Sequence, residues 1–199
     1  MPNGPLSLPA RLCLLAWDLD PTRAAPVVRA GALADLARRG LLVDDDGIAT
    51  PRDLDSRTGD PALDGLLELV SESFPHGWRT WVTLHARHTL DAVREHLVAE
   101  GVLRAEKHRV LGVFPSVDHV LADTARADAL RTEAQEVLSG AVTPDETTAT
   151  VLTLAAAADL PVAASGTVPM VPTDLASAAV LHELEAGLRD AAPALPKGR

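Results

Sequence analysis

Two arginines are the residues of this sequence whose type and placement best suit ligand binding. Arg29 falls in the first turn of a helix that we expect to begin at Pro26, and Arg87, or alternatively Arg94, accompanies a second helix. A guanidinium group donates two parallel hydrogen bonds to a phosphate, and a helix N-terminus favours the same negative charge. We therefore expect an anion site at Arg29 and Arg87 if the two helices pack side by side.

The two arginines also have a simpler interpretation as ordinary surface charges. Exposed ion pairs are common and contribute little to stability. The carboxylates of Asp18, Asp20 and Asp91 are close enough in the sequence to pair with either arginine. Further cations nearby in the sequence are Arg11 and Arg23.

Other groups of reactive residues fall short of a catalytic or metal site. His85 and His88 could share one helix face, but no cysteine or carboxylate completes the three or four ligands that zinc needs. The turn Asp44–Gly47 lacks the alternating ligands and distal glutamate of a calcium loop. No Gly-x-Ser-x-Gly elbow or glycine-rich phosphate loop occurs in the sequence. We therefore predict no enzyme activity, no cofactor and no metal site.

The helices that would position the arginines belong to two similar units. In the first, Val27–Gly40 has apolar residues at helical spacing, ends at a glycine and is followed by a hairpin with the acidic turn Asp44–Gly47. In the second, Thr89–Gly101 is the helix, and a hairpin follows again. Its strands are expected at Val102–Leu103 and Arg109–Phe114, around a charged turn at Arg104–His108.

The fold class predicted from these patterns is mainly α, a single helical domain with about seven helices and two short β-hairpins. Residues 1–10 are expected to form a flexible arm, residues 11–192 the domain and residues 193–199 a frayed tail. The apolar run Leu12–Trp17, which contains Cys13, is predicted to be buried. The remaining helices are expected to start at Pro61, Trp78, Asp123 or Thr124, Pro144 and Asp174.

Composition narrows the class of protein. Of the 199 residues, 47% are hydrophobic but only 3% are aromatic, so the core must consist of Leu, Val and Ala, which favours helices. A net charge of −10 argues against broad nucleic-acid binding, which depends on phosphate neutralisation. The single cysteine excludes an internal disulfide, and no signal-like segment is present, so we expect a cytoplasmic protein.

The order of these signals resembles the Golgi phosphoprotein 3 family, which are peripheral membrane proteins with a helical core and many bacterial members. A helix-glycine-strand succession comes first, then a Thr-Gly-Asp-Pro helix start, then Glu-Gly-Val-Leu with a charged turn and hairpin. The stretches that carry the resemblance are Arg29–Leu42, Thr58–Ser73, Leu97–Phe114 and Thr150–Asp159.

The resemblance implies a lipid head-group site. Eukaryotic members bind phosphatidylinositol 4-phosphate through a tryptophan, an arginine early in the first helix and two basic residues near the later one. Arg29 and Arg87 match two of these four positions, Leu90 takes the place of the second basic residue, and Trp17 stands three residues before the tryptophan position. Arg23 is an additional cation beside this set.

The second hairpin has its own implied role. In the family the corresponding hairpin mediates self-association and contacts membranes, which would give a homo-oligomer. The alternative is that its apolar residues simply cover the core. The residues concerned are Val110, Leu111, Val113 and Phe114.

Three functions follow from these observations. The first is a peripheral membrane adaptor on the inner face of the membrane, which binds an anionic phospholipid head group. The second is a protein-interaction or self-association module without a lipid ligand. The third is a winged-helix-like nucleic-acid-binding regulator, because a helix followed by a strand, a turn and a strand is half of a winged helix. The acidic turn Asp44–Gly47 and the net charge of −10 count against the third.

Overall fold

The computed structural model describes residues 5–53, 55–110, 114–164, 166–168 and 175–192, and this part of the chain is mainly α, as predicted. Its α-helices are α1 (Leu8–Leu15), α2 (Pro21–Arg38), α3 (Pro61–Glu72), α4 (Trp78–Thr83), α5 (Ala86–Ala99), α6 (Thr124–Leu138), α7 (Glu146–Ala157) and α8 (Leu175–Ala191). Two antiparallel hairpins consist of β1 (Leu42–Asp45) with β2 (Ile48–Pro51), and β3 (Leu103–Val110) with β4 (Phe114–Leu121). A short 3-10 turn, η1, covers Pro161–Ala163.

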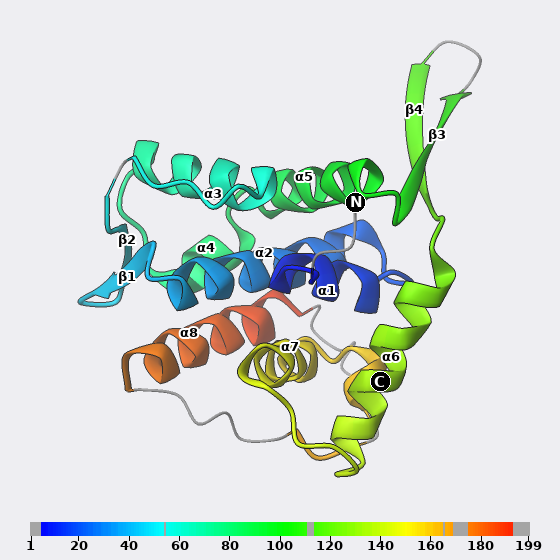
Figure 1. Cartoon of the computed structure of the whole chain (residues 1–199). Helices are drawn as coiled ribbons and strands as arrows, with labels where there is room; N and C mark the ends of the chain where they lie inside the picture. Colours follow the sequence, from blue (N-terminus) through cyan, green and yellow to red (C-terminus); the bar gives the residue numbers. More distant parts are fainter. Residues whose placement is uncertain (1–4, 54, 111–113, 165, 169–174, 193–199) are drawn as a thin grey trace, which may run out of the picture.

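Helix α2 runs through the centre of the molecule. It lies between an upper layer of α3 and α5 and a lower layer of α7 and α8, with α1 and α4 at its own level (Figure 1). Val28, Ala30 and Leu33 are fully buried, because neighbouring helices surround α2. α1 crosses it so closely that a Cβ atom on Gly31 would lie 2.6 Å from Cδ1 of Leu12. The core is therefore built around a helix of small residues.

The predicted start of α2 at Pro26 is wrong. Asp20 caps the helix, accepting a hydrogen bond of 2.8 Å from the N–H of Thr22, and Pro21 occupies the first turn. Pro26 lies inside the helix instead. Arg29 is consequently in the middle of α2 and not in its first turn, so the helix N-terminus gives no support to an anion at Arg29.

The segment before α5 also differs from expectation. The helix expected to start at Trp78 ends at Thr83, and His85 adopts a left-handed conformation with φ of 53° before α5 begins at Ala86. Thr89, expected as the cap, is a buried residue inside α5. Arg87 therefore lies in the first turn of α5.

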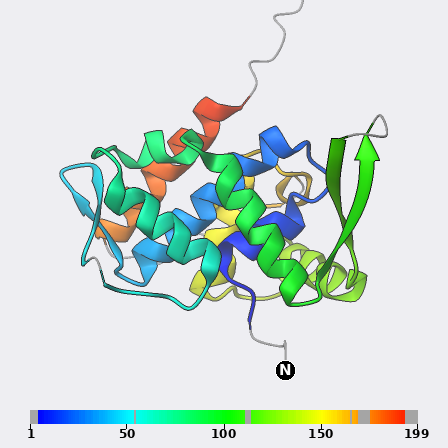
Figure 2. The same ribbon diagram turned by 90° about the horizontal axis from the view of Figure 1, so that it is seen from above.

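The two hairpins were predicted with different success. In β1–β2 the turn falls at Asp46 and Gly47, both with positive φ, as the acidic turn indicated. In β3–β4 the expected turn at Arg104–His108 is wrong, because these residues pair with β4 from Val120 to Ser116. Charged residues suit a two-stranded ribbon that projects from the helical body, as this one does in Figures 1 and 2.

The apolar residues singled out on this hairpin lie at its far end. Val110 and Phe114 form the last backbone pair of the ribbon. Leu111 and Val113 lie outside the described residues, so their predicted role stays a prediction.

The end of the predicted arm and the start of α7 need further correction. α1 begins at Leu8, and Leu8 and Ala10 are buried, so residues 8–10 belong to the core and not to an arm. α7 begins at Glu146 with Asp145 as its cap, two residues later than expected from Pro144.

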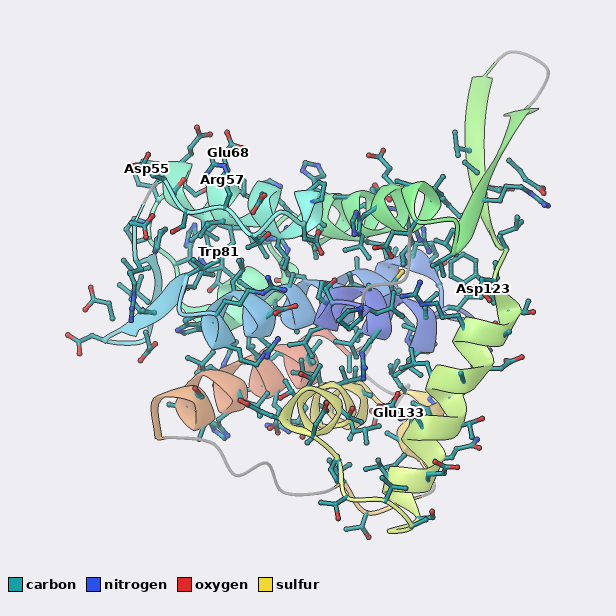
Figure 3. The ribbon with its side chains drawn as sticks, viewed as in Figure 1. Asp55, Arg57, Glu68, Trp81, Asp123 and Glu133 are labelled. Carbon is teal, nitrogen blue, oxygen red and sulfur yellow. The ribbon has the colours of Figure 1, made fainter. Side chains whose placement is uncertain are left out.

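The interior also holds Trp81, whose side chain is fully buried (Figure 3). None of the helices in the described part of the chain has the length and hydropathy needed to cross a membrane.

Candidate anion-binding site

Arg29 is a buried cation without a carboxylate partner among the described residues. Its side chain is 0% exposed, and its Nη2 donates a hydrogen bond of 2.6 Å to the backbone carbonyl of His85. Its Nε and Nη1 have no partner in the part of the chain that the structure describes. Burial lowers the pKa of Arg29 to about 10, because the charged form loses its hydration. The resulting positive potential lies directly beneath the start of α5.

Arg87 lies above this buried cation, at the surface. Its side chain is 54% exposed, and its Nε contacts a carboxylate oxygen of Asp91 at 3.0 Å. Hydrogen bonds from Thr22 lower the pKa of Asp20, and the Arg87 charge contributes to the same shift. Arg87 therefore lies close to the start of α2, so the two predicted arginines do come from neighbouring segments. Only Arg87 is accessible.

A pocket of about 430 Å³ opens between α5 and the β3–β4 hairpin, and Arg87 is part of its wall. Arg94, about two helical turns further along α5, lines the same pocket. Charges of both signs are present, because carboxylates from α5 and a histidine from β4 face the arginines. The remaining lining residues are Asp91, Glu95, Val98, Ala105, Val117 and His119.

Trp17 joins this group through Arg94. The guanidinium carbon of Arg94 lies 5.8 Å from the centroid of the Trp17 ring, within the range of a cation–π interaction. The Nε atom of Arg94 is buried and has no hydrogen-bond partner among the described residues. Burial, helped by the Arg94 charge, lowers the pKa of His119, so this histidine resists protonation in the pocket. The guanidinium group of Arg94 thus packs against an aromatic ring and still has a hydrogen-bond donor without a partner among the described residues.

The structure separates the remaining predicted residues from this pocket. Arg23 is exposed near the start of α2 and lines a small depression beside α8 instead. Leu90, at the position of the missing basic residue, is fully buried. His85 and His88 stack with ring centroids 5.6 Å apart, and no group of three metal-ligating side chains occurs among the described residues.

His119 is the site residue that sequence reasoning missed altogether. The sequence interpretation placed no strand at 116–121, because it put the hairpin turn too early. With the turn placed after Val110, alternation along β4 would have directed His119 and Val117 to the α5 side of the ribbon. Arg94 was considered only as an alternative to Arg87, whereas the structure places both in one pocket.

Comparison with known proteins gives a family match that covers most of the chain. A search of curated proteins finds no match. The family model described as Golgi phosphoprotein 3 matches residues 8–196, which begin at the first residue of α1 and continue past the end of α8. The match therefore includes helix α5 and the β3–β4 hairpin, whose residues line the pocket between them. The chain belongs to the Golgi phosphoprotein 3 family.

Proposed function

We propose that this protein is a peripheral membrane adaptor that binds an anionic phospholipid head group in the pocket between α5 and the β3–β4 hairpin. The observation that carries the proposal is the placement of Arg87 and Arg94 on one wall of that pocket. Two guanidinium groups on one helix give a phosphate several charge-assisted donors. The Trp17 ring contacts Arg94 through a cation–π interaction.

Arg29 supports the same site from below the surface. It is fully buried and bonds to the carbonyl of His85, two residues before Arg87. A charge in a poorly hydrated interior acts over a longer distance than one in water. Arg29 therefore adds attraction for an anion at Arg87, and in this conformation it does so without direct contact.

The hairpin beside the pocket gives the membrane a second point of contact. β3 carries Arg104, Lys107 and Arg109, although the chain as a whole has a net charge of −10. Basic residues near an anionic bilayer contribute roughly 1 kcal/mol each. Val117, on the pocket side of β4, is 48% exposed. The acidic residues Glu106 and Asp118 on the same ribbon offset part of this charge. A projecting ribbon with a small excess of basic residues and some apolar residues suits an interfacial position.

Co-sedimentation with liposomes tests the proposal. Neutral vesicles, vesicles with a generic anionic lipid and vesicles with phosphatidylinositol 4-phosphate are compared for the wild type and for Arg87→Gln combined with Arg94→Gln. We expect salt-sensitive binding to anionic vesicles, which the double substitution weakens by about tenfold or more. Selective binding to the phosphoinositide would identify the head group, and equal binding to all anionic vesicles would indicate general charge recognition.

Arg189 provides a matched control for this experiment. Like Arg87 it forms an i,i+4 ion pair, with Glu185 at 3.1 Å, and it is 52% exposed, but it lies on α8. Arg189→Gln, compared with the single substitution Arg87→Gln, removes one exposed positive charge without touching the pocket, so its binding should equal that of the wild type. Equal binding by the wild type and the double variant would exclude the pocket as the lipid-binding site.

Self-association through the hairpin is a second candidate function. Within the described residues β3 and β4 pair only with each other, so both outer edges of the ribbon are open. An open edge can pair with a second copy of the chain. Sedimentation velocity over a range of concentrations would show a dimer or higher oligomer, and a monomer at all concentrations would exclude this function.

A further inference from the structure

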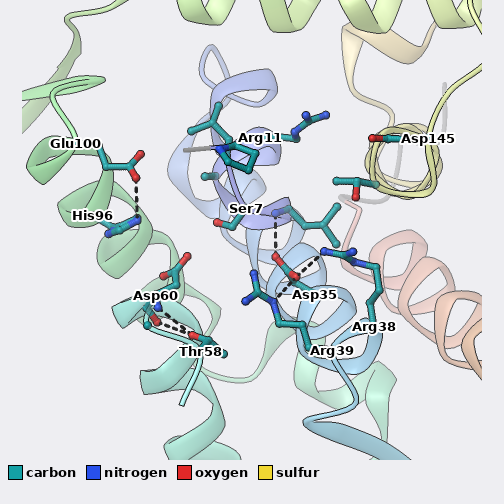
Figure 4. A pocket seen from close by; sticks show the side chains of 16 residues that line it. Ser7, Arg11, Asp35, Arg38, Arg39, Thr58, Asp60, His96, Glu100 and Asp145 are labelled. Carbon is teal, nitrogen blue, oxygen red and sulfur yellow. Dashed lines mark hydrogen bonds and ion pairs between the residues drawn. The ribbon is translucent and has the colours of Figure 1, made fainter. Parts of the chain in front are cut away.

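A second and larger pocket lies away from the α5–hairpin site and shares no residue with it. Its volume is about 520 Å³, within the range of small-molecule sites. The start of α1, the C-terminal turn of α2, the loop before α3, the last turn of α5 and the start of α7 all contribute to its wall. Segments distant in sequence thus converge on one polar cavity (Figure 4).

One side of the pocket is an arginine clamp built on a buried carboxylate. Asp35 is 0% exposed and accepts hydrogen bonds from Arg39 Nε at 2.8 Å, Arg38 Nη2 at 3.2 Å and the N–H of Leu8 at 3.1 Å. Both arginine side chains are 37% exposed. Each therefore has one nitrogen fixed against Asp35 and others free to reach the pocket, in the part of the chain that the structure describes.

Two further charged residues lie on this side. Arg11 donates to Glu133 and Thr148, where α6 faces α7 in Figure 3, so it is largely engaged outside the pocket. Asp145 accepts the N–H of Thr148 at 2.7 Å as the cap of α7. Both carboxylates on this side, Asp35 and Asp145, are thus bonded to backbone N–H groups, whereas the clamp has donors to spare.

The opposite side of the pocket is acidic. Figure 4 shows Asp60, Glu100 and His96 across from the arginine clamp. Glu100 stands at the C-terminal end of α5, where the helix dipole already favours a cation, and contacts His96 at 3.5 Å. Asp60 caps α3 with one oxygen. The pocket is therefore polarised, with guanidinium groups that have spare donors on one side and the carboxylates of Asp60 and Glu100 on the other.

We propose that this pocket binds a compact zwitterion, with an oxyanion group on Arg38 and Arg39 and an ammonium group between Asp60 and Glu100. A simple anion would bind the clamp but would give the two carboxylates on the opposite side no positive charge to pair with. A simple cation would do the reverse. A ligand with both charges can pair with both sides. Its charge-assisted hydrogen bonds to both sides give it a higher affinity than either half has alone.

The geometry of the clamp suits ligand binding better than stabilisation of the fold. A buried carboxylate is weak evidence for stability, because its desolvation offsets much of the attraction to its partners. Here one carboxylate holds two guanidinium groups in fixed positions at the rim of a cavity. The hydrogen bond that Arg39 donates to Asp35 raises the pKa of Arg39, and the charge of Asp60 across the pocket adds to the shift.

Isothermal titration calorimetry on the full chain tests the proposal with phosphoethanolamine as the probe. Inorganic phosphate and ethanolamine, its two halves, are titrated separately. We expect saturable binding of phosphoethanolamine that is at least about tenfold tighter than that of either half. Arg39→Gln and Glu100→Gln, one from each side, should each weaken it by about tenfold or more, and Arg189→Gln should not change it.

Three results would overturn the proposal. These are no saturable binding of phosphoethanolamine, phosphate binding as tightly as phosphoethanolamine, or affinity that survives both Arg39→Gln and Glu100→Gln. Because two variants from different elements are used, a folding defect in one, detected by circular dichroism, leaves the other informative. Vesicles of phosphatidylethanolamine then separate the sources: retention of the wild type but not of Arg39→Gln indicates a lipid head group, and no retention indicates a free metabolite.

Discussion

Replacing Arg29 with methionine should make the protein more stable and a weaker membrane binder. The pKa of Arg29 falls to about 10 because of burial. At ~1.4 kcal/mol per pKa unit, the charged group destabilises the fold by about 3 kcal/mol. Because the folded pKa lies below the unfolded one, this penalty is present at every pH below about 10.

The hydrogen bond to His85 offsets part of that penalty. A bond from a charged donor contributes about 1.5–3 kcal/mol, and the substitution removes it. Methionine keeps most of the aliphatic stem and adds no polar group. The net expectation for Arg29→Met is a gain of about 1 kcal/mol in the free energy of unfolding, or roughly 2–4 °C in Tm.

Urea unfolding followed by circular dichroism measures the change, with Arg104→Met as the control. Arg104 is 67% exposed, so its replacement should change stability by less than about 0.5 kcal/mol. The reasoning would be refuted if Arg29→Met lost about 2 kcal/mol or more, because the guanidinium group would then be a structural requirement at the start of α5. Weaker binding to anionic vesicles at higher stability would mark Arg29 as a functional residue.

Further expectations concern the core and the hydrogen bonds at the start of α3. Burial raises the pKa of Cys13 to about 11, so iodoacetamide should label it at neutral pH only after unfolding; rapid labelling of the native protein would contradict this. Gly31→Ala should destabilise the fold by about 1–3 kcal/mol through collision with α1, whereas Gly65→Ala, with open space around it, should stabilise α3 by roughly 0.5–1 kcal/mol. Equal changes in Tm for Gly31→Ala and Gly65→Ala would contradict the close crossing of α1 and α2. Burial alone would raise the pKa of Asp64, but hydrogen bonds from Thr58 and its neighbour lower it overall. Asp64→Asn should therefore destabilise the protein by ~1 kcal/mol at pH 7, and urea titrations should show this difference shrinking below about pH 4.

Local signals in the sequence located the ends of the helices well. Gly40 and Gly101 were expected to end helices and adopt φ of 67° and 77° after α2 and α5. The pair Asp60-Pro61 was expected to start a helix and does so. These features depend on one or two residues and the backbone between them, so no tertiary information was needed.

The errors had two causes, a missed local cap signal and contacts between distant segments. The start of α2 was misplaced because Asp20-Pro21 was taken for a loop and Pro26 for the first turn. That error put Arg29 at an accessible helix end, whereas the structure buries it against His85. The α5–hairpin pocket depends on β4 folding back beside α5, and spacing in the sequence does not encode that contact.

Trp17 allows the most direct test of the proposed membrane site. It lies beside Arg94, whereas Trp78 and Trp81 are fully buried. Vesicles of brominated anionic lipid should therefore quench part of the tryptophan fluorescence of the wild type, and Trp17→Phe should remove the quenched part. Vesicle binding with the same fractional quenching in the wild type and in Trp17→Phe would mean that another face of the protein meets the membrane.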